Sequence, residues 1–142
     1  MNDDEKKTRP VIAAAETYRR TEVMTSNRET ILLMMYSGTL RFIKGAIRST
    51  EEGDLQEKAR FIGKTQEIVN ELRATLDFSV GGDIAKQLDM LYGFITDRLT
   101  ESMVRKDTKY LKEALSVLTT LNEAWEQAVA QIRKNEENDL IK

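Results

Sequence analysis

Apolar residues recur at three- and four-residue steps along most of the chain, which is the period of one face of an α-helix. The four stripes are Leu40, Phe42, Ile43, Ala46 and Ile47; Leu55, Ala59, Ile62, Val69, Leu72 and Leu76, broadened by Phe61 and Ile68; Ile84, Leu88, Leu91, Ile95 and Leu99; and Leu111, Leu115, Leu118, Leu121, Trp125, Ala128 and Ile132. Charged residues fill the positions between them. The pattern predicts four amphipathic helices that bury their apolar faces together.

Start and stop signals divide the same stretch into four segments. Ser26 with Glu29 has the spacing of a capping box, and Asp54, Asp83 and Asp107 stand where N-caps of the next helices are expected. Gly53 and the Gly81-Gly82 pair interrupt the pattern between helices. The predicted helices end near Arg48, Leu76, Met103 and Lys134. We expect Asp77 to cap or pin the loop before the glycine pair.

Three of the predicted connections are short, and short connections between long helices favour antiparallel neighbours. We therefore predict an all-α fold, an antiparallel up-down four-helix bundle over residues 26–134. Residues 1–25 are expected to form a partly ordered N-terminal arm that is flexible or caps the bundle. Residues 135–142 are expected to form a polar C-terminal tail that frays.

The first helix carries more apolar residues than one face can use. Its stretch ILLMMY, Ile31 to Tyr36, is apolar all round. On a helical wheel Leu33 falls at the margin of the core face and Met34 falls among the arginines, on the polar side. Surplus apolar surface of this kind is typical of an interaction site, and the flexible thioether of methionine suits an irregular partner.

Ile31 also aligns with Gly38 and Gly45, which remove side chains from one strip of the helix. Glycine inside a helix costs about 1 kcal/mol relative to alanine, so something is expected to pack closely there. Two interpretations stay open at this point. The strip packs tightly against a neighbouring helix of the bundle, or it forms a shallow apolar groove for a separate chain.

The composition of the chain argues against several classes of function. The 142 residues contain neither Cys nor His, so no thiolate, imidazole base or soft metal site is available, and no Gly-rich phosphate loop is present. We predict that the protein is not an enzyme and uses no cofactor or metal. The net charge of −2 disfavours nucleic acid, and no apolar run is long enough for membrane insertion. With no signal-peptide core at the N-terminus, we expect a cytoplasmic protein.

Several segments, in order, resemble the FliS family of flagellar export chaperones, which hold flagellin. They are ETYRRTEVMTS (Glu16–Ser26), TSNRETILLMMYSGTLRFIKGAI (Thr25–Ile47), NELRATLDFSVGGDIAKQLDMLYGFITDRL (Asn70–Leu99) and LTTLNEAWEQA (Leu118–Ala128). The resemblance covers roughly Tyr18 to Ala128. Asn27 departs from the family, which usually has proline directly after the N-cap serine.

The resemblance implies an antiparallel helical bundle that binds the disordered C-terminal region of flagellin through apolar grooves. By the same resemblance, the protein is expected to prevent premature polymerisation of flagellin and to deliver the subunit to the flagellar export gate. The chaperone is expected to reach this gate as part of its complex with flagellin. The resemblance also implies that the N-terminal arm covers part of the groove when no client is present; a permanent staple onto the first helix is the alternative. The residues we expect at the partner surface are Tyr18, Val23, Ile31, Leu33, Met34, Gly38, Leu72, Leu76, Leu88, Leu91 and Tyr92, of which the last five fit the core equally well.

Other functions stay open on the sequence alone. A helical adaptor that self-associates through the same strip, down to a weak homodimer, fits the surplus apolar surface. A chaperone or regulator of another secreted protein fits it as well, because an apolar groove indicates the character of a client and not its identity. A hydrolase built on carboxylates alone would need a converging pair, and no spacing indicates one.

Overall fold

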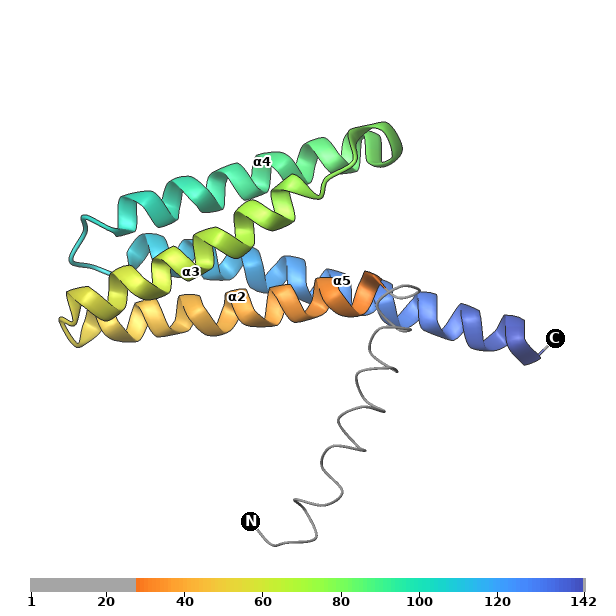
Figure 1. Cartoon of the computed structure of the whole chain (residues 1–142), viewed down its shortest axis with the longest axis horizontal. Coiled ribbons are helices and arrows are strands. Elements are labelled where there is room, and N and C mark those ends of the chain that lie inside the picture. Colours follow the sequence, from red (N-terminus) through yellow and green to blue (C-terminus); the bar gives the residue numbers. More distant parts are fainter. Residues whose placement is uncertain (1–27, 142) are drawn as a thin grey trace, which may run out of the picture. The chain divides into compact units, whose positions relative to one another are not determined.

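The computed structural model describes residues 28–141, which form α-helices joined by short connections (Figure 1). The helices are α2 (Arg28–Glu51), α3 (Leu55–Ala74), α4 (Phe78–Ser102) and α5 (Lys109–Ile141). The chain divides into two compact units, residues 1–32 and 33–142, and the helix packing lies within the second unit. The predicted all-α class is confirmed. The described residues do not include the expected N-terminal arm (1–25), with its residues Tyr18 and Val23, or the expected cap Ser26.

The helices pack as a bundle in which successive helices run in opposite directions (Figure 1). Helix α4 packs against both α3 and α5. Helix α2 contacts α3 through the rings of Phe42 and Phe61, whose centroids are 6.3 Å apart. Tyr36 of α2 reaches across the interior to Tyr92 of α4. The interior is therefore closed by side chains from all four of these helices.

The core is apolar and follows the predicted stripes over the middle of each helix. Its buried apolar members are Tyr36, Ile43, Ala46, Ile62, Val69, Leu72, Ala85, Tyr92, Ile95, Leu99, Leu111, Ala114, Leu118 and Val129. Buried hydroxyls such as that of Thr39 donate to the carbonyl one turn earlier in their own helix, here that of Met35 at 2.8 Å. Their hydrogen bonds are thus satisfied without a partner from another helix.

Several residues assigned to the core by periodicity are exposed. Leu55 and Ile84 are 71% and 66% exposed, and Ala59, Ala128 and Ile132 are exposed as well. Leu55, Ile84 and Ile132 lie near the ends of their apolar stripes. The period of a helix indicates which face is apolar, but it does not indicate how far along that face a neighbouring helix extends.

The expected N-cap Asp54 is confirmed, because its side chain accepts a hydrogen bond from the Glu57 backbone N–H at 3.1 Å. Oδ1 of Asp107 accepts from the Lys109 N–H at 3.1 Å, but α5 begins at Lys109 and the Thr108 carbonyl accepts the Lys112 N–H at 2.9 Å, so Thr108, and not Asp107, stands at the N-cap position. Gly53 adopts φ 73°, the left-handed conformation that the tight α2–α3 turn requires. Asp54 and Gly53 could be predicted from the sequence because an aspartate at an N-cap and a glycine with positive φ each satisfy a local requirement of the backbone.

The start of α4 differs from the prediction. Asp77, and not Asp83, is its N-cap, because the Asp77 carboxylate accepts from the N–H groups of Ser79 and Val80. The expected interruption at the glycine pair is confirmed, because Gly82, at φ 51° and ψ −123°, has a non-helical backbone conformation. What differs is that the residues before it, from Phe78 on, already form a helical turn, which joins the rest of α4 across this kink. The expectation that Asp77 caps this segment is confirmed.

Helix α5 continues to Ile141 instead of ending near Lys134. Its last residues, from Ala130 onward, are all exposed. Glu, Gln, Lys and Arg have high helix propensity, and no proline or glycine interrupts the segment. The expected fraying tail is therefore helical in this structure, although it contributes nothing to the buried core.

The glycines of α2 pack against α3. A Cβ at Gly45 would stand 2.9 Å from the ring of Phe61, and one at Gly38 would stand 3.5 Å from Cδ1 of Ile68. Both glycines are buried. Of the two interpretations of the glycine strip, tight helix packing is the one that the structure supports, and the open groove at this strip is not observed.

Candidate partner-binding surface

Met34 lies on the solvent side of α2, as its position on the helical wheel predicts. Its side chain is 66% exposed. Ser37, Arg41 and Lys44 follow it at helical spacing and are exposed too. Residues three or four apart are neighbours on a helix, so Met34 continues this stripe one turn before Ser37. The exposed side of α2 thus begins with an apolar side chain and continues with cations.

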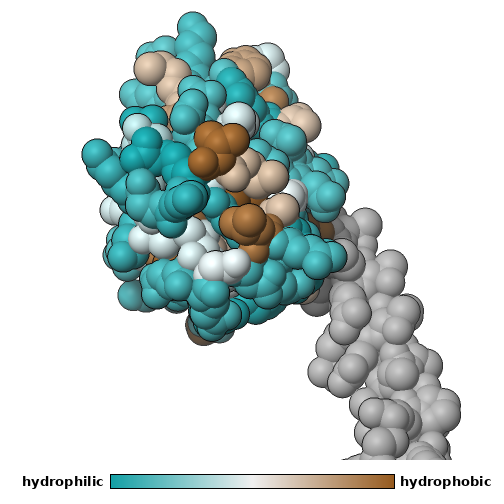
Figure 2. Space-filling model, turned by 90° about the vertical axis from the view of Figure 1, so that its left-hand side faces the viewer, coloured by the Kyte–Doolittle hydropathy of each residue, from teal (hydrophilic) through white to brown (hydrophobic). Residues whose placement is uncertain are grey.

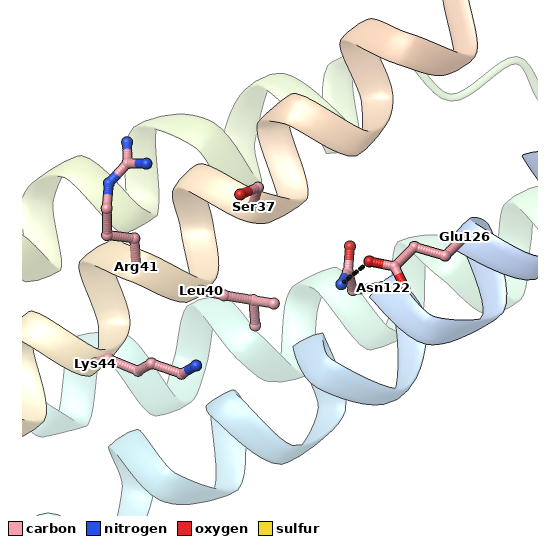
Figure 3. Close-up of a pocket in the computed structure, with 6 residues that line it drawn as sticks. All are labelled: Ser37, Leu40, Arg41, Lys44, Asn122 and Glu126. Atoms are coloured by element: carbon pink, nitrogen blue, oxygen red, sulfur yellow. Dashed lines mark hydrogen bonds between the residues drawn. The ribbon is translucent and has the colours of Figure 1, made fainter.

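A shallow cleft of about 360 Å³ runs beside this stripe, between α2 and α5 (Figure 3). Its lining residues are Ser37, Leu40, Arg41, Lys44, Asn122 and Glu126. Leu40 and Lys44 extend from α2 toward α5, where Nδ2 of Asn122 donates to Oε1 of Glu126 at 3.0 Å (Figure 3). The cleft therefore combines an apolar side chain with a cation and an amide–carboxylate pair.

A second apolar region lies on α4. Ile84, Leu88, Leu91 and Ile95 follow one another at steps of four, three and four residues, so they share one stripe of the helix. Their exposure falls along the stripe: Ile84 is 66% exposed, Leu88 and Leu91 are half-buried, and Ile95 is fully buried. A single apolar stripe therefore leads from the solvent into the core. We call Ile84, Leu88 and Leu91 the α4 stripe.

The first turn of α4 adds to this apolar surface. Phe78 and Val80 are 50% and 85% exposed, and Leu76 just before them is half-buried. The Asp77 cap holds this turn in place, and its Oδ1 also accepts from the Ser79 hydroxyl at 2.5 Å. That hydroxyl bond, with the two backbone N–H groups, holds the pKa of the Asp77 carboxyl below its ordinary value. The carboxylate is therefore charged, and the cap fixes the exposed turn.

Three aromatic side chains join α2, α4 and α5 by hydrogen bonds. The hydroxyl oxygens of Tyr36 and Tyr92 are 2.5 Å apart, and Nε1 of Trp125 donates to the Tyr36 hydroxyl at 3.3 Å. Burial raises the pKa of Tyr36, and burial together with the bond to Tyr36 raises that of Tyr92. Both hydroxyls stay protonated at neutral pH. The network fixes α2 relative to α4 and α5.

The expected surface residues fall into three groups. Met34 is exposed, and Ile31, Leu33, Leu76, Leu88 and Leu91 are half-buried. Gly38, Leu72 and Tyr92 are buried, the last two at 2% exposure, so in this conformation they support the bundle and offer no surface. Tyr18 and Val23 lie outside the described residues.

Sequence reasoning missed three exposed apolar residues at the beginning of α4. Phe78 and Val80 were read as part of a loop, and Ile84 was read as core. For Phe78 and Val80 the available signal was the glycine pair that follows them, because a kink close to a helix end turns the residues before it away from the packed face. The exposure of Ile84, which lies after the kink, had no such signal.

Across residues 28–141, no three acidic side chains come together in a way that could hold a metal ion. None of the helices there is both long and apolar enough to cross a membrane.

Comparison with known proteins identifies the family. The model of the family described as Flagellar protein FliS matches residues 11–132. The Flagellar secretion chaperone FliS of Bacillus subtilis is 30% identical over 118 residues, covering 83% of this chain and 87% of the relative. The protein of the same name from Vibrio cholerae is 32% identical over 98 residues, covering 68% and 71%. That from Salmonella typhimurium is 30% identical over 116 residues, covering 81% and 86%.

The family match spans most of the chain, including all of α2, α3 and α4 and most of α5. It agrees with the resemblance carried by the sequence motifs and with the helical bundle. This chain belongs to the FliS family of flagellar secretion chaperones.

Proposed function

We propose that this protein binds the disordered C-terminal region of flagellin in the cytoplasm, prevents its premature polymerisation and delivers it to the flagellar export apparatus. The observation that carries the proposal is the apolar surface that remains exposed although the interior is filled. Its members are Met34 on α2 and, on another helix, the α4 stripe with Phe78 and Val80. The names of the relatives, flagellar secretion chaperones, indicate the kind of client.

The physics of such binding is coupled folding. Ordering a disordered segment costs free energy, and the burial of apolar surface on both chains outweighs this cost. The half-buried leucines of the α4 stripe offer partly formed sites into which apolar side chains of the client pack. Arg41 and Lys44, which line the cleft two and three turns after Met34 on α2, offer positions for acidic side chains of the client. No catalytic step and no bound cofactor is needed for this activity.

The test is titration of the protein with the isolated C-terminal segment of its flagellin, followed by circular dichroism and calorimetry. We expect the segment to gain helix on binding. Met34→Lys should leave the thermal unfolding temperature nearly unchanged and weaken binding about ten-fold, because it places a charge where apolar contact is expected. Trp125, the single tryptophan, lies between Asn122 and Glu126 of the cleft in the sequence and should report binding by fluorescence.

Met90→Lys is the matched control. Met90 is 74% exposed on α4, and six residues from Ile84 it lies on a different side of the helix from the α4 stripe. It receives the same substitution as Met34, and binding should not change. Equal weakening by both variants would contradict the assigned surface. Early unfolding of Met34→Lys with binding intact would place Met34 in the core. A stable dimer that buries Met34, seen by light scattering, would support the self-associating adaptor instead.

A further inference from the structure

The sides on which α4 and α5 face each other can be identified near their connection. Nε of Arg98 on α4 binds Oε2 of Glu113 on α5 at 2.8 Å, and the Arg98 guanidinium lies 4.7 Å from the centroid of the Tyr110 ring. These three residues therefore mark the facing sides. Figure 1 shows that the two helices run in opposite directions and separate toward the end where α4 begins.

On α4, apolar residues continue along the side that Arg98 marks. Leu91 and Ile84 lie seven and fourteen residues before Arg98, which is about two and four helical turns, so they share its side. Leu91 is half-buried, and Ile84 is 66% exposed. The side of α4 that faces α5 is thus covered near Arg98 and uncovered toward the beginning of the helix.

On α5, apolar residues continue along the side that Glu113 and Tyr110 mark. Ala124 lies eleven residues, about three turns, after Glu113, and Ala128 lies eighteen residues, about five turns, after Tyr110. Both alanines are exposed, and Ile132, one turn further, is 39% exposed. The side of α5 that faces α4 is therefore uncovered over the same half of the bundle.

The uncovered residues of the two helices lie at the same level. A helix rises 1.5 Å per residue, so Ile84 is about 21 Å along α4 from Arg98, and Ala128 is about 22 Å along α5 from Glu113. Ile84 and Ala128 would bury each other if the helices were in contact at this level. Because both are exposed, the space between them is open. We call it the α4–α5 trough, and its walls are Ile84, Leu88 and Leu91 of α4 and Ala124, Ala128 and Ile132 of α5.

The facing sides of the trough carry no charge. Residues 84–94 of α4 and 117–132 of α5 include four charged residues, and all of them lie on other sides of their helices: Lys86, Asp89, Glu123 and Glu126. Asp89 binds Arg73 of α3, and Glu126 lines the cleft beside α2. The other two are exposed to solvent. The walls of the trough are therefore apolar along their whole length.

The edges of the trough are polar and nearly uncharged. Gln87 on α4 and Gln131 on α5 share the facing sides and are exposed. Just beyond the trough, Asp83 stands at the outer edge of α4. Arg133 and Lys134 follow the last wall residue of α5 but lie on other sides of that helix. Side-chain amides are thus the main polar groups that border the open space.

The opposite end of the bundle has different surroundings. Figure 2 views the end where α2 turns into α3, and it shows apolar residues among hydrophilic ones. Leu55, Met103 and Val104 are exposed there, and charges of both signs border them, among them Glu52 and Lys106. That end indicates no particular partner, whereas the absence of charge in the trough is a specific property.

These features indicate what the trough accepts. Both walls are helices, whose backbone groups are already paired, so an extended chain between them would leave its own N–H and C=O groups without partners. A helix pairs its backbone groups internally and presents an apolar face. A charged side chain on that face would lose its hydration and gain no counter-charge. The trough therefore fits an amphipathic helix whose apolar face and adjoining edges are uncharged.

We propose that the α4–α5 trough receives one helix of the client, formed from a segment that is disordered before binding and uncharged on its buried face. This inference rests on the proposed function, in which the client is the C-terminal region of flagellin. It adds α5 as a second wall opposite the α4 stripe, and it assigns Ala124, Ala128 and Ile132 to the binding surface.

The test compares two substitutions of exposed alanines on α5 in the full-length protein. Ala128→Glu places a carboxylate in the trough. Ala130→Glu is the matched control, because two residues correspond to 200° around the helix and place the carboxylate on the nearly opposite side. We expect Ala128→Glu to weaken binding of the flagellin C-terminal segment about ten-fold or more in calorimetry, and Ala130→Glu to leave it within about two-fold. Both variants should unfold at nearly the original temperature, since neither alanine is buried.

A second measurement does not depend on the identity of the client. Its probe is a synthetic helix-forming peptide with leucine on one face, glutamine and serine elsewhere, and charges only at its ends. Added to the full-length protein with labelled alanine and isoleucine methyls, it should shift the resonances of Ala124, Ala128 and Ile84 and not that of Ala130. Peptides with glutamate or lysine at the positions that flank the leucine face should bind about ten-fold more weakly.

Failure of this inference differs from failure of the proposed function. If the flagellin segment binds and Ala128→Glu weakens it no more than Ala130→Glu does, the trough is not its site, and the proposed function stands. If the flagellin segment does not bind but the uncharged peptide binds in the trough, the client is another protein, and the trough stands. If neither binds, both proposals are wrong.

Two other occupants would overturn the proposal. A concentration-dependent shift of the Ala128 methyl without peptide, together with a doubled mass by light scattering, would make the trough a contact between copies of this chain. NOEs from residues 1–25 to the Ala128 methyl that persist in the complex with the flagellin segment would assign the trough to the protein's own N-terminal segment.

Discussion

The two halves of α4 carry the same kinds of residue and have opposite surroundings. Ile95 and Leu99, in the second half, are fully buried between neighbouring helices. Ile84, on the same stripe in the first half, is 66% exposed, with Phe78 and Val80 also exposed before it. This difference shows that the interior of the bundle is filled without the apolar side chains of the first half of α4. They are a surplus, and selection for folding alone would not require them.

Truncation of the two isoleucines should separate the halves most strongly. Ile95→Ala removes a fully buried side chain and should lower the free energy of unfolding by about 2–5 kcal/mol. Ile84→Ala removes a mostly exposed one and should change it by less than about 0.5 kcal/mol. Urea denaturation followed by circular dichroism measures both. A loss at Ile84 as large as that at Ile95 would mean that the α4 stripe is part of the core throughout.

The tyrosine pair tests how the buried half is fixed. Tyr36→Phe removes the hydrogen-bond partner of both Tyr92 and Trp125, so it should destabilise by about 1–3 kcal/mol. Tyr92→Phe should cost less, about 0.5–1.5 kcal/mol, because the Tyr36 hydroxyl keeps its bond to Trp125. The same denaturation experiment ranks the two. The reverse order would show that the hydroxyl of Tyr92 has a stronger role than its one bond to Tyr36 suggests.

Glycine-to-alanine substitutions test packing between α2 and α3. A Cβ at Gly63 meets nothing within 4 Å, so Gly63→Ala should stabilise the helix by about 1 kcal/mol. A Cβ at Gly45 would stand 2.9 Å from the Phe61 ring, so Gly45→Ala should lose that gain. Thermal unfolding of the two variants provides the comparison. Equal stabilisation by both would show that α2 and α3 are less closely packed than described.

The smallest expected effect is the pH dependence of the Asp77 cap, which fixes the exposed first turn of α4. Hydrogen bonds from the Ser79 hydroxyl, then from the Val80 and Ser79 N–H groups, lower the pKa of Asp77 in the folded protein below its ordinary 3.8. A lowered folded pKa means that the stabilisation is complete above the unfolded value and is lost as pH falls through the folded one. We expect the ¹³C resonance of the Asp77 carboxyl to titrate below 3.8, and Ser79→Ala to raise that midpoint. An unshifted midpoint would contradict the cap.

The sequence alone was sufficient to predict the middle part of each helix and several of the residues buried there. The stripes predicted the four helices and buried residues such as Ile43, Ile62 and Leu118, and the cap at Asp54 followed from local chemistry. The wheel also put Met34 on the exposed side of α2. These are properties of a helix and its nearest residues, which a sequence records directly.

The ends of the elements were not predictable in the same way. Asp83 was expected as the cap of α4 because the helix was predicted to start after the glycine pair, whereas α4 starts one turn earlier, after Asp77, and is interrupted at Gly82. Leu55 and Ile84 were assigned to the core because periodicity cannot show where a neighbouring helix stops. The contact of Gly45 with Phe61 joins two different helices. The apolar period of one helix does not indicate which residue of another helix packs against it.

The central claim is that the exposed end of the α4 stripe, with Met34, is apolar surface that another chain buries. Its most direct test is a methyl NMR experiment on the complex of this protein with the flagellin C-terminal segment, using labelled isoleucine and methionine methyls. We predict intermolecular NOEs from the segment to the methyls of Ile84 and Met34 and none to Ile95. A complex that forms with no NOE to Ile84 or Met34 would contradict the account.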